Sequence, residues 1–121
     1  MAKKILVVDD SAVVRQVQEA VLTKAGYEVV SANGGKEAVA KLEIATFNLI
    51  LTDLNMPDMD GVSLIKAVRG SNKHRLTPIV MITTESKDSK KQEGRSAGAT
   101  AWVVKPFTPD QLLSVVKRIV G

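Results

Sequence analysis

Short apolar runs recur along the chain, and turn-forming residues separate them. Runs of this kind, bounded by Gly, Pro, Asn or Asp, are typical of strands that are buried on both faces. They predict five strands, at residues 4–8, 27–32, 49–53, 79–83 and 101–104.

Apolar residues recur at helical spacing between the first three strands. The first helix is predicted to begin at Ser11 and to end at Gly26. Its inner face is expected to carry Val14, Val17, Val21 and Ala25. A turn at residues 33–35 precedes a second helix. The inner face of this helix is expected to carry Ala38, Val39, Leu42 and Ala45.

Two further helices have recognisable ends. Residues 62–68 are predicted to be helical, and Gly70 ends that helix. The last helix begins at Thr108 as the N-cap, with Pro109 at the first helical position. Gln111 completes a capping box.

The stretch of residues 86–98 differs from the other connections because it has almost no apolar residue. If it forms a helix, little burial stabilises that helix, so we expect it to be the most mobile element. Its surface is expected to be basic through Lys87, Lys90, Lys91 and Arg95.

Strands and helices alternate along the whole chain, and the strands are mostly uninterrupted apolar runs. This order favours an α/β fold in which helices cover both faces of a parallel sheet. Right-handed crossovers indicate a doubly wound five-stranded sheet, since a closed barrel needs about twice the length. The 121 residues contain no linker-like segment, so we expect residues 1–121 to form a single domain.

Composition narrows the class of protein. The hydrophobic fraction of 45% and the charged fraction of 25% are ordinary for a globular chain, and cysteine is absent. No apolar run is long enough for a membrane span, and the apolar run after Lys3 and Lys4 is too short for a signal peptide. We therefore expect a cytoplasmic protein with no membrane partner. The net charge of +4 and the aromatic fraction of 3% give little support to nucleic-acid binding.

Polar side chains that can carry chemistry follow four of the predicted strands. Asp9 and Asp10 follow the first strand, Asp53 ends the third, Thr83 ends the fourth and Lys105 follows the fifth. The carboxyl ends of parallel strands meet at one edge of a sheet, which is where ligands bind in open α/β folds. We therefore expect these side chains to converge, with Asp53 as the reactive residue.

Three carboxylates in one cleft repel each other, and a divalent cation relieves that repulsion. Oxygen ligands without Cys or His indicate Mg²⁺, with Mn²⁺ as a substitute, rather than Zn²⁺. Asp10 and Asp53 are the best candidate ligands, together with the backbone carbonyl of Asn55. Lys105 and Thr83 can each contact a phosphoryl oxygen. The hypothesis is in-line transfer of a phosphoryl group to Asp53, driven by positioning and charge neutralisation.

Each of these residues also has an ordinary structural interpretation. The Asp9-Asp10 pair can simply cap the first helix, Thr83 can be a plain strand residue, and Lys105 can be a surface lysine. Their joint occurrence at successive strand ends favours the functional interpretation. His74 lies in a polar loop and is expected to be exposed, whereas Trp102 lies in a strand and is expected to pack in the core.

Four motifs together carry a resemblance over the whole chain. They read VVDDS, LTDLNMPDMDG, ITTES and WVVKPF, at residues 7–11, 51–61, 82–86 and 102–107. This set resembles the response-regulator receiver domain of two-component signalling, and within it the chemotaxis regulators. The resemblance, rather than the hydrophobic pattern, implies a flavodoxin-like sheet with strand order 2-1-3-4-5.

The resemblance also implies residue roles. Asp53 would be the phosphoacceptor, Asp9 and Asp10 would organise Mg²⁺, and Lys105 would contact the phosphoryl group. The Lys105–Pro106 bond would be cis and would aim the lysine into the site. Such a domain catalyses its own Mg²⁺-dependent phosphorylation and dephosphorylation on aspartate.

Further roles follow for residues around the site. Thr83 and Trp102 would act as a switch that couples phosphorylation to residues 86–98, the fifth strand and the last helix. Asn55 and Glu85 would tune the lifetime of the phosphoryl group, and their polar side chains predict a short-lived phosphoform. A basic face is expected to bind an acidic or amphipathic partner segment, through Lys90, Lys91, Arg95, Lys117 and Arg118.

The leading hypothesis is a stand-alone, monomeric signalling switch. It would take its phosphoryl group from a CheA-like sensor histidine kinase and bind a target, the flagellar motor switch, with a phosphatase as a further partner. No effector domain is expected after Gly121. The alternatives are a phosphorelay intermediate that serves a histidine phosphotransfer protein, and a receiver separated from a DNA-binding regulator. A flavodoxin-like FMN protein is disfavoured because Asp9-Asp10 would repel the phosphate of the flavin.

Overall fold

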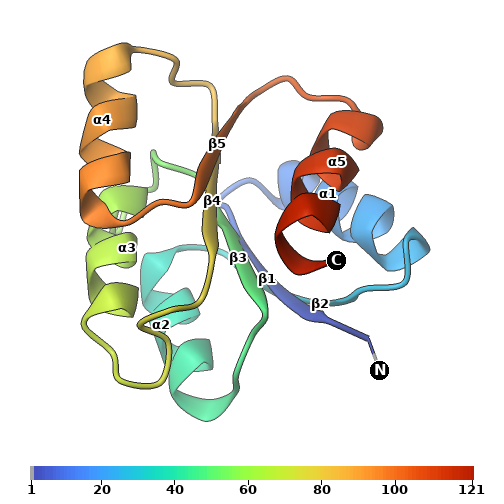
Figure 1. The fold of residues 1–121 in the computed structure, drawn as a ribbon, viewed down its shortest axis with the longest axis horizontal. Helices are drawn as coiled ribbons and strands as arrows, with labels where there is room; N and C mark the ends of the chain where they lie inside the picture. The colour runs from blue at the N-terminus through green and yellow to red at the C-terminus, as the bar shows by residue number, and fades with distance from the viewer. Residues whose placement is uncertain (1) are drawn as a thin grey trace.

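A parallel sheet of five strands forms the centre of the molecule (Figure 1). The structure is a computed structural model, and it describes residues 2–121. The strands lie in the order β2-β1-β3-β4-β5. They are β1 (Lys4–Val8), β2 (Glu28–Ala32), β3 (Leu49–Thr52), β4 (Ile79–Thr83) and β5 (Ala101–Val104). The order is that of the doubly wound, flavodoxin-like fold, as the resemblance implied.

Five helices cover the two faces of the sheet (Figure 1). On one face lie α2 (Gly35–Ile44), α3 (Gly61–Arg69) and α4 (Asp88–Ala97). On the other face lie α1 (Ala12–Lys24) and α5 (Pro109–Val120). In the part of the chain that the structure describes, every helix is too short or too polar to cross a lipid bilayer.

The strands divide the apolar side chains between two cores. In β1, Leu6 and Val8 pack beneath the α2–α3–α4 layer, whereas Ile5 and Val7 pack beneath α1 and α5. This alternation follows from the two-residue period of a strand, and burial of both sets requires helices on both faces. All residues of β3 and β4 are buried as well, which explains why both strands are apolar up to their final threonine.

Side-chain caps begin three of the helices. Ser11 caps α1 and Asp60 caps α3, each by accepting a hydrogen bond from a backbone N–H of the first turn. Thr108 and Gln111 form the predicted capping box of α5. The end of α1 is also as predicted, because Gly26 follows it with a φ of 98°.

The inner face of α1 differs from the prediction. Val17 is 50% exposed and Ala25 is exposed, whereas Gln18 and Leu22 are buried. The other two predicted positions are half-buried. Apolar residues on two neighbouring faces of this helix have helical spacing, so the pattern alone does not identify the inner face. The face that carries Leu22 is turned inward, because its large side chain fills the core under α1 and α5.

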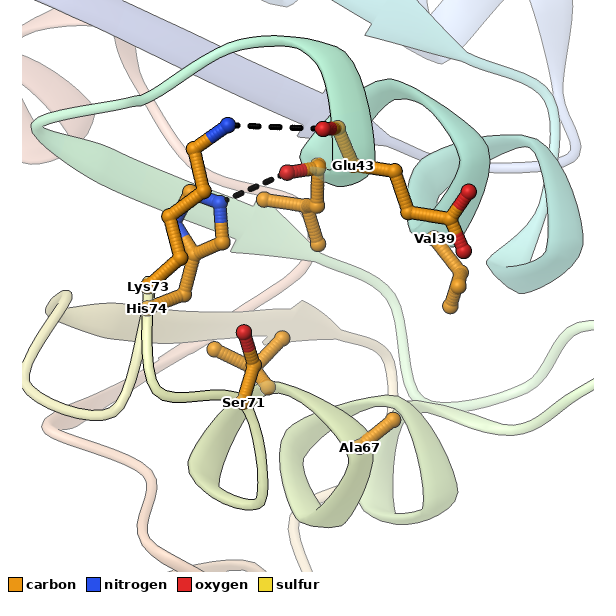
Figure 2. A pocket seen from close by; sticks show the side chains of 8 residues that line it. Val39, Glu43, Ala67, Ser71, Lys73 and His74 are labelled. Atoms are coloured by element: carbon orange, nitrogen blue, oxygen red, sulfur yellow. Dashed lines mark hydrogen bonds between the residues drawn. The ribbon is translucent and has the colours of Figure 1, made fainter.

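His74 is buried, so the expectation of an exposed loop histidine was wrong. It is 2% exposed, and its Nε2 lies 2.8 Å from the carbonyl oxygen of Leu42 (Figure 2). A carbonyl oxygen only accepts hydrogen bonds, so Nε2 carries the proton. Lys73 Nζ donates to the adjacent carbonyl of Glu43 at 3.4 Å. The last carbonyl groups of a helix lack partners within it, and the loop after α3 supplies partners to α2.

The burial of Leu22 generates a stability prediction. Leu22→Ala should lower the free energy of unfolding by about 2–5 kcal/mol, because it leaves a cavity in the core under α1 and α5. Val17→Ala, on the exposed stripe of the same helix, should change it by about 0.5 kcal/mol or less. Urea unfolding of the wild type and both variants checks this prediction, provided that the three proteins give the same m-value. Equal effects at the two positions would contradict the observed face of α1.

Candidate functional site

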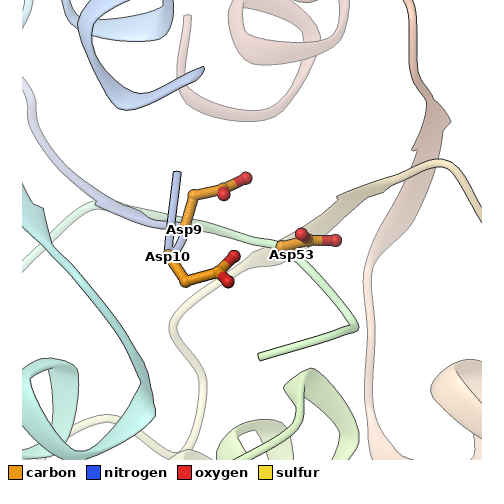
Figure 3. A group of neighbouring side chains, drawn as sticks. All are labelled: Asp9, Asp10 and Asp53. Atoms are coloured by element: carbon orange, nitrogen blue, oxygen red, sulfur yellow. The ribbon is translucent and has the colours of Figure 1, made fainter. Parts of the chain in front are cut away.

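Three aspartates meet at the carboxyl edge of the sheet (Figure 3). Asp9 and Asp10 directly follow β1, and Asp53 directly follows β3. One carboxylate oxygen from each lies within 4.8 Å of the others. Asp9 is buried, Asp53 is half-buried and Asp10 is exposed, so the cluster opens from the sheet edge toward solvent.

Backbone pairing of neighbouring strands places these side chains. Val8 pairs with Thr52 at the ends of β1 and β3, and the Asp53 N–H donates to the Val8 carbonyl at 3.0 Å. The Asp9 N–H donates in the same way to the carbonyl of Ala32 in β2, at 3.2 Å. Asp9 and Asp53 therefore continue the hydrogen bonding of the sheet by one residue. The ends of rigid strands position these two carboxylates.

The turn between β1 and α1 further fixes Asp9. Its Oδ1 accepts a hydrogen bond from the Ser11 N–H at 2.9 Å, and its carbonyl oxygen accepts one from Arg15 Nη1 at 2.6 Å. Ser11 is the N-cap of α1, so the interpretation of the aspartate pair as the helix cap was wrong. Sequence reasoning missed Arg15, because its partner is a backbone oxygen that leaves no mark in the sequence.

Lys105 brings a positive charge from the end of β5. Its Nζ lies 2.7 Å from Asp9 Oδ2 and 3.4 Å from Asp53 Oδ2. The interpretation as an ordinary surface lysine is therefore wrong. The Lys105–Pro106 bond is cis, as the resemblance implied. The Lys105 N–H donates to the Thr83 carbonyl at 2.8 Å, which ties the lysine to the end of β4.

The donor set fits a hard divalent cation. Three carboxylates face one ammonium group within the cluster, which leaves an excess of negative charge. The candidate ligands are all oxygen atoms, which Mg²⁺ prefers. Asp53 Oδ1 already accepts a hydrogen bond from the Leu54 N–H at 2.7 Å. This bond orients the Asp53 carboxylate in the cleft.

Thr83 and Trp102 both contact Glu85, in the loop between β4 and α4. Thr83 is fully buried, and its Oγ1 accepts a hydrogen bond from the Glu85 N–H at 3.4 Å. Trp102 Nε1 donates to the Glu85 carbonyl at 2.9 Å. The indole is half-buried and packs at the edge of the core under α2, α3 and α4, so the expected core packing is only partial.

The two residues expected to tune the phosphoryl lifetime lie on the loops around the site. Asn55 follows Asp53 by two positions and is exposed. The Glu85 carboxylate accepts a hydrogen bond from the Lys87 N–H at 3.0 Å, at the start of α4. In this arrangement Glu85 stabilises its own loop, and both roles stay predictions.

Comparisons with known proteins identify the family of this chain. The family described as the response regulator receiver domain matches residues 5–117. Chemotaxis protein CheY1 of Helicobacter pylori strain J99 is 41% identical over 120 residues, which cover 98% of this chain and 97% of the relative.

Solved structures agree in fold as well. Chemotaxis protein CheY4 of Vibrio cholerae superposes with a TM-score of 0.95 at 48% identity, over 98% of this chain and 99% of that one. The receiver domain of the sensor histidine kinase PA1611 of Pseudomonas aeruginosa has a TM-score of 0.92 at 30% identity, over 100% and 99% of the two chains. In that structure a magnesium ion is coordinated in the active-site cleft. The present chain therefore belongs to the response regulator receiver domain family of two-component signalling, and CheY-type chemotaxis proteins are among its relatives.

Proposed function

We propose that this chain is a phosphorylation-activated switch that accepts a phosphoryl group on Asp53 from a histidine kinase. One observation carries the proposal: Asp53 shares a cluster with Asp9 and Asp10, and Lys105 Nζ lies 3.4 Å from its carboxylate. In the transfer, an oxygen of Asp53 forms a bond to phosphorus as the bond between phosphorus and the donor histidine nitrogen breaks. The electron pair of the broken bond leaves with the imidazole.

The side chains supply positioning and charge rather than acid–base chemistry. Asp9, Asp10 and Asp53, with the backbone carbonyl of Asn55, would hold Mg²⁺. Bound there, the ion would neutralise charge on the phosphoryl oxygens. Lys105 would contact a further phosphoryl oxygen. The same groups would serve the domain's own dephosphorylation, with Asn55 and Glu85 setting its rate.

The contacts of Glu85 support a route from the site to the surface. The Thr83 hydroxyl accepts a hydrogen bond from the Glu85 N–H, and the Trp102 indole donates one to the Glu85 carbonyl. The hydrogen bond from the Glu85 N–H to Thr83 is long, so it would break readily if the threonine hydroxyl moved to donate a hydrogen bond to the phosphoryl group. Trp102 would then move with the loop and shift the population of conformations at α4 and β5.

The charges of α4 and α5 indicate an acidic or amphipathic partner segment. Lys90, Arg95, Lys117 and Arg118 are exposed, and Lys91 is half-buried. Lys90 forms only an exposed ion pair with Glu93 at 3.4 Å, which costs little to break. We propose a cytoplasmic monomer that acts in chemotaxis, with a CheA-like kinase as donor and the flagellar motor switch as target. The chemotaxis relatives support this assignment.

A phosphorelay intermediate would use the same active site, and the names of the relatives favour the chemotaxis role over it. The two functions differ in their product. A relay protein passes its phosphoryl group to a histidine phosphotransfer protein, whereas a switch keeps it until hydrolysis. Transfer of label from the phosphorylated chain to such a protein, faster than release of phosphate, would favour the relay.

The proposal predicts one covalent adduct. Incubation with acetyl phosphate and Mg²⁺ should add the mass of a single phosphoryl group, because the proposal assigns Asp53 as the single acceptor. Asp53→Asn should remove the adduct, and chelation of Mg²⁺ should lower its yield severalfold. Intact mass spectrometry checks all three results. An adduct that persists in Asp53→Asn would overturn the assignment of the acceptor.

The route through Trp102 predicts a spectroscopic change. A Cβ added at Gly94 would lie 2.7 Å from Cζ3 of the indole, so Gly94→Ala should push the ring outward and break its bond to Glu85. Because Trp102 is the single tryptophan, its fluorescence emission should shift to longer wavelength. Addition of beryllofluoride, a phosphoryl mimic, should then change the emission of the variant less than that of the wild type.

The matched control is Ser96→Ala, which changes an exposed position of the same helix. Its emission and its response to beryllofluoride should equal those of the wild type. If Gly94→Ala gives the same emission and the same response as this control, the position of the Trp102 ring does not depend on the absence of a side chain at Gly94.

A further inference from the structure

The loop that follows β3 and Asp53 is joined by hydrogen bonds to helix α2. Gly34 is the N-cap of helix α2, which therefore has no side-chain cap of its own. The carboxylate of Asp58 takes that place from the loop of residues 54–60: Oδ2 accepts the Lys36 N–H at 3.0 Å, and Oδ1 accepts the Gly35 N–H at 3.3 Å. One side chain thus joins the acceptor loop to the amino end of α2.

Two glycines allow this close approach. A Cβ added at Gly34 would lie 2.7 Å from Asp58 Oδ1, and one at Gly35 would lie 2.6 Å from the Cβ of Met59. The hydrogen bond from the Lys36 N–H lowers the pKa of Asp58, so the carboxylate is ionised at neutral pH. A negative charge at this position also complements the positive end of the α2 dipole.

The rest of the loop is anchored near its ends. Leu54 donates its N–H to Asp53 Oδ1, and its carbonyl accepts the Gly61 N–H at 2.8 Å. Leu54 and Met56 are buried, and Asn55 lies between them. The bonds of Asp58 tie the outer side of this loop, three residues after Asn55, to α2.

We propose that Asp58 is a positioning residue for the metal site: it holds the loop of residues 54–60 against α2 and so places the Asn55 carbonyl for Mg²⁺. The inference rests on the proposed function, which assigns that carbonyl as a ligand. Asp58 does not touch the ion in this scheme. It acts through the backbone of its loop, as outer partners of metal ligands commonly do.

The alternative role for Asp58 is that of a helix cap alone. A cap stabilises the fold and would leave the metal affinity of the folded protein unchanged. The two roles therefore differ in one measurable quantity, the dissociation constant for Mg²⁺ of the folded, unphosphorylated chain.

Isothermal titration calorimetry with MgCl₂ on the full chain measures that constant. Asp58→Ala should weaken Mg²⁺ binding about tenfold, the lower end of the range for outer-shell partners. Asp58→Asn should recover part of the loss, because one acceptor oxygen remains. Gly34→Ala should mimic Asp58→Ala, since the new methyl group displaces the carboxylate while every charge is retained.

Glu37→Ala is the matched control. Glu37 accepts the Asn33 N–H at 2.7 Å at the same helix end, so this variant also removes a carboxylate there but leaves the loop tied to α2. Its Mg²⁺ affinity should stay within about twofold of wild type, because a screened exposed charge contributes little. Thermal unfolding by circular dichroism establishes that each variant is folded during the titration.

The outcomes separate the inference from the proposed function. Wild-type affinity in folded Asp58→Ala or Gly34→Ala overturns the positioning role and leaves the metal site intact. An equal loss in Glu37→Ala also overturns it, because charge alone would then explain the effect. Absence of Mg²⁺ binding in the wild type overturns the proposed metal site and the inference together. If Asp58→Ala does not fold, Gly34→Ala and Asp58→Asn decide the question.

Discussion

The repulsion among Asp9, Asp10 and Asp53 is the constraint on which the rest of the structure depends. Three carboxylate oxygens within 4.8 Å of one another repel each other, and they stay together only where the backbone that carries them cannot relax. Parallel pairing of β1 with β3 provides that rigidity, because both strands are buried on both faces. The apolar cores thus hold the charges together, and their burial offsets the cost of keeping the carboxylates close.

The sheet order determines which charges can respond to this repulsion. β3 is the central strand, so Asp53 stands between the aspartates after β1 and the residues at the ends of β4 and β5. Lys105 reaches across from β5 to Asp9 and Asp53, and Thr83 lies on the strand between them. Asp53 is therefore surrounded by residues that lie far apart in the sequence. An event at Asp53 can act on several elements at once.

Features with a local cause could be predicted from the sequence, and features with a distant cause could not. Asp53 could be placed because an apolar run and a cluster of turn formers surround it. The burial of His74 depends on a carbonyl of α2 that lies 32 positions earlier, and the stripe of α1 that faces inward depends on the space available to Leu22. The sequence likewise does not distinguish Asp58 from any other loop aspartate, because its partners, the N–H groups of Gly35 and Lys36, lie more than 20 positions earlier.

Helix α4 buries few of its side chains, and this has a consequence for how far its sequence can vary. Gly94 is the buried residue of this helix, and the remaining side chains are exposed or half-buried. Substitutions at those exposed positions remove few packing contacts, so they change the outer surface at little cost in folding stability. Gly94 is the exception, because the Trp102 ring occupies the space beside it. The outer surface of α4 can therefore vary in sequence while the sheet and the cluster of Asp9, Asp10 and Asp53 stay the same.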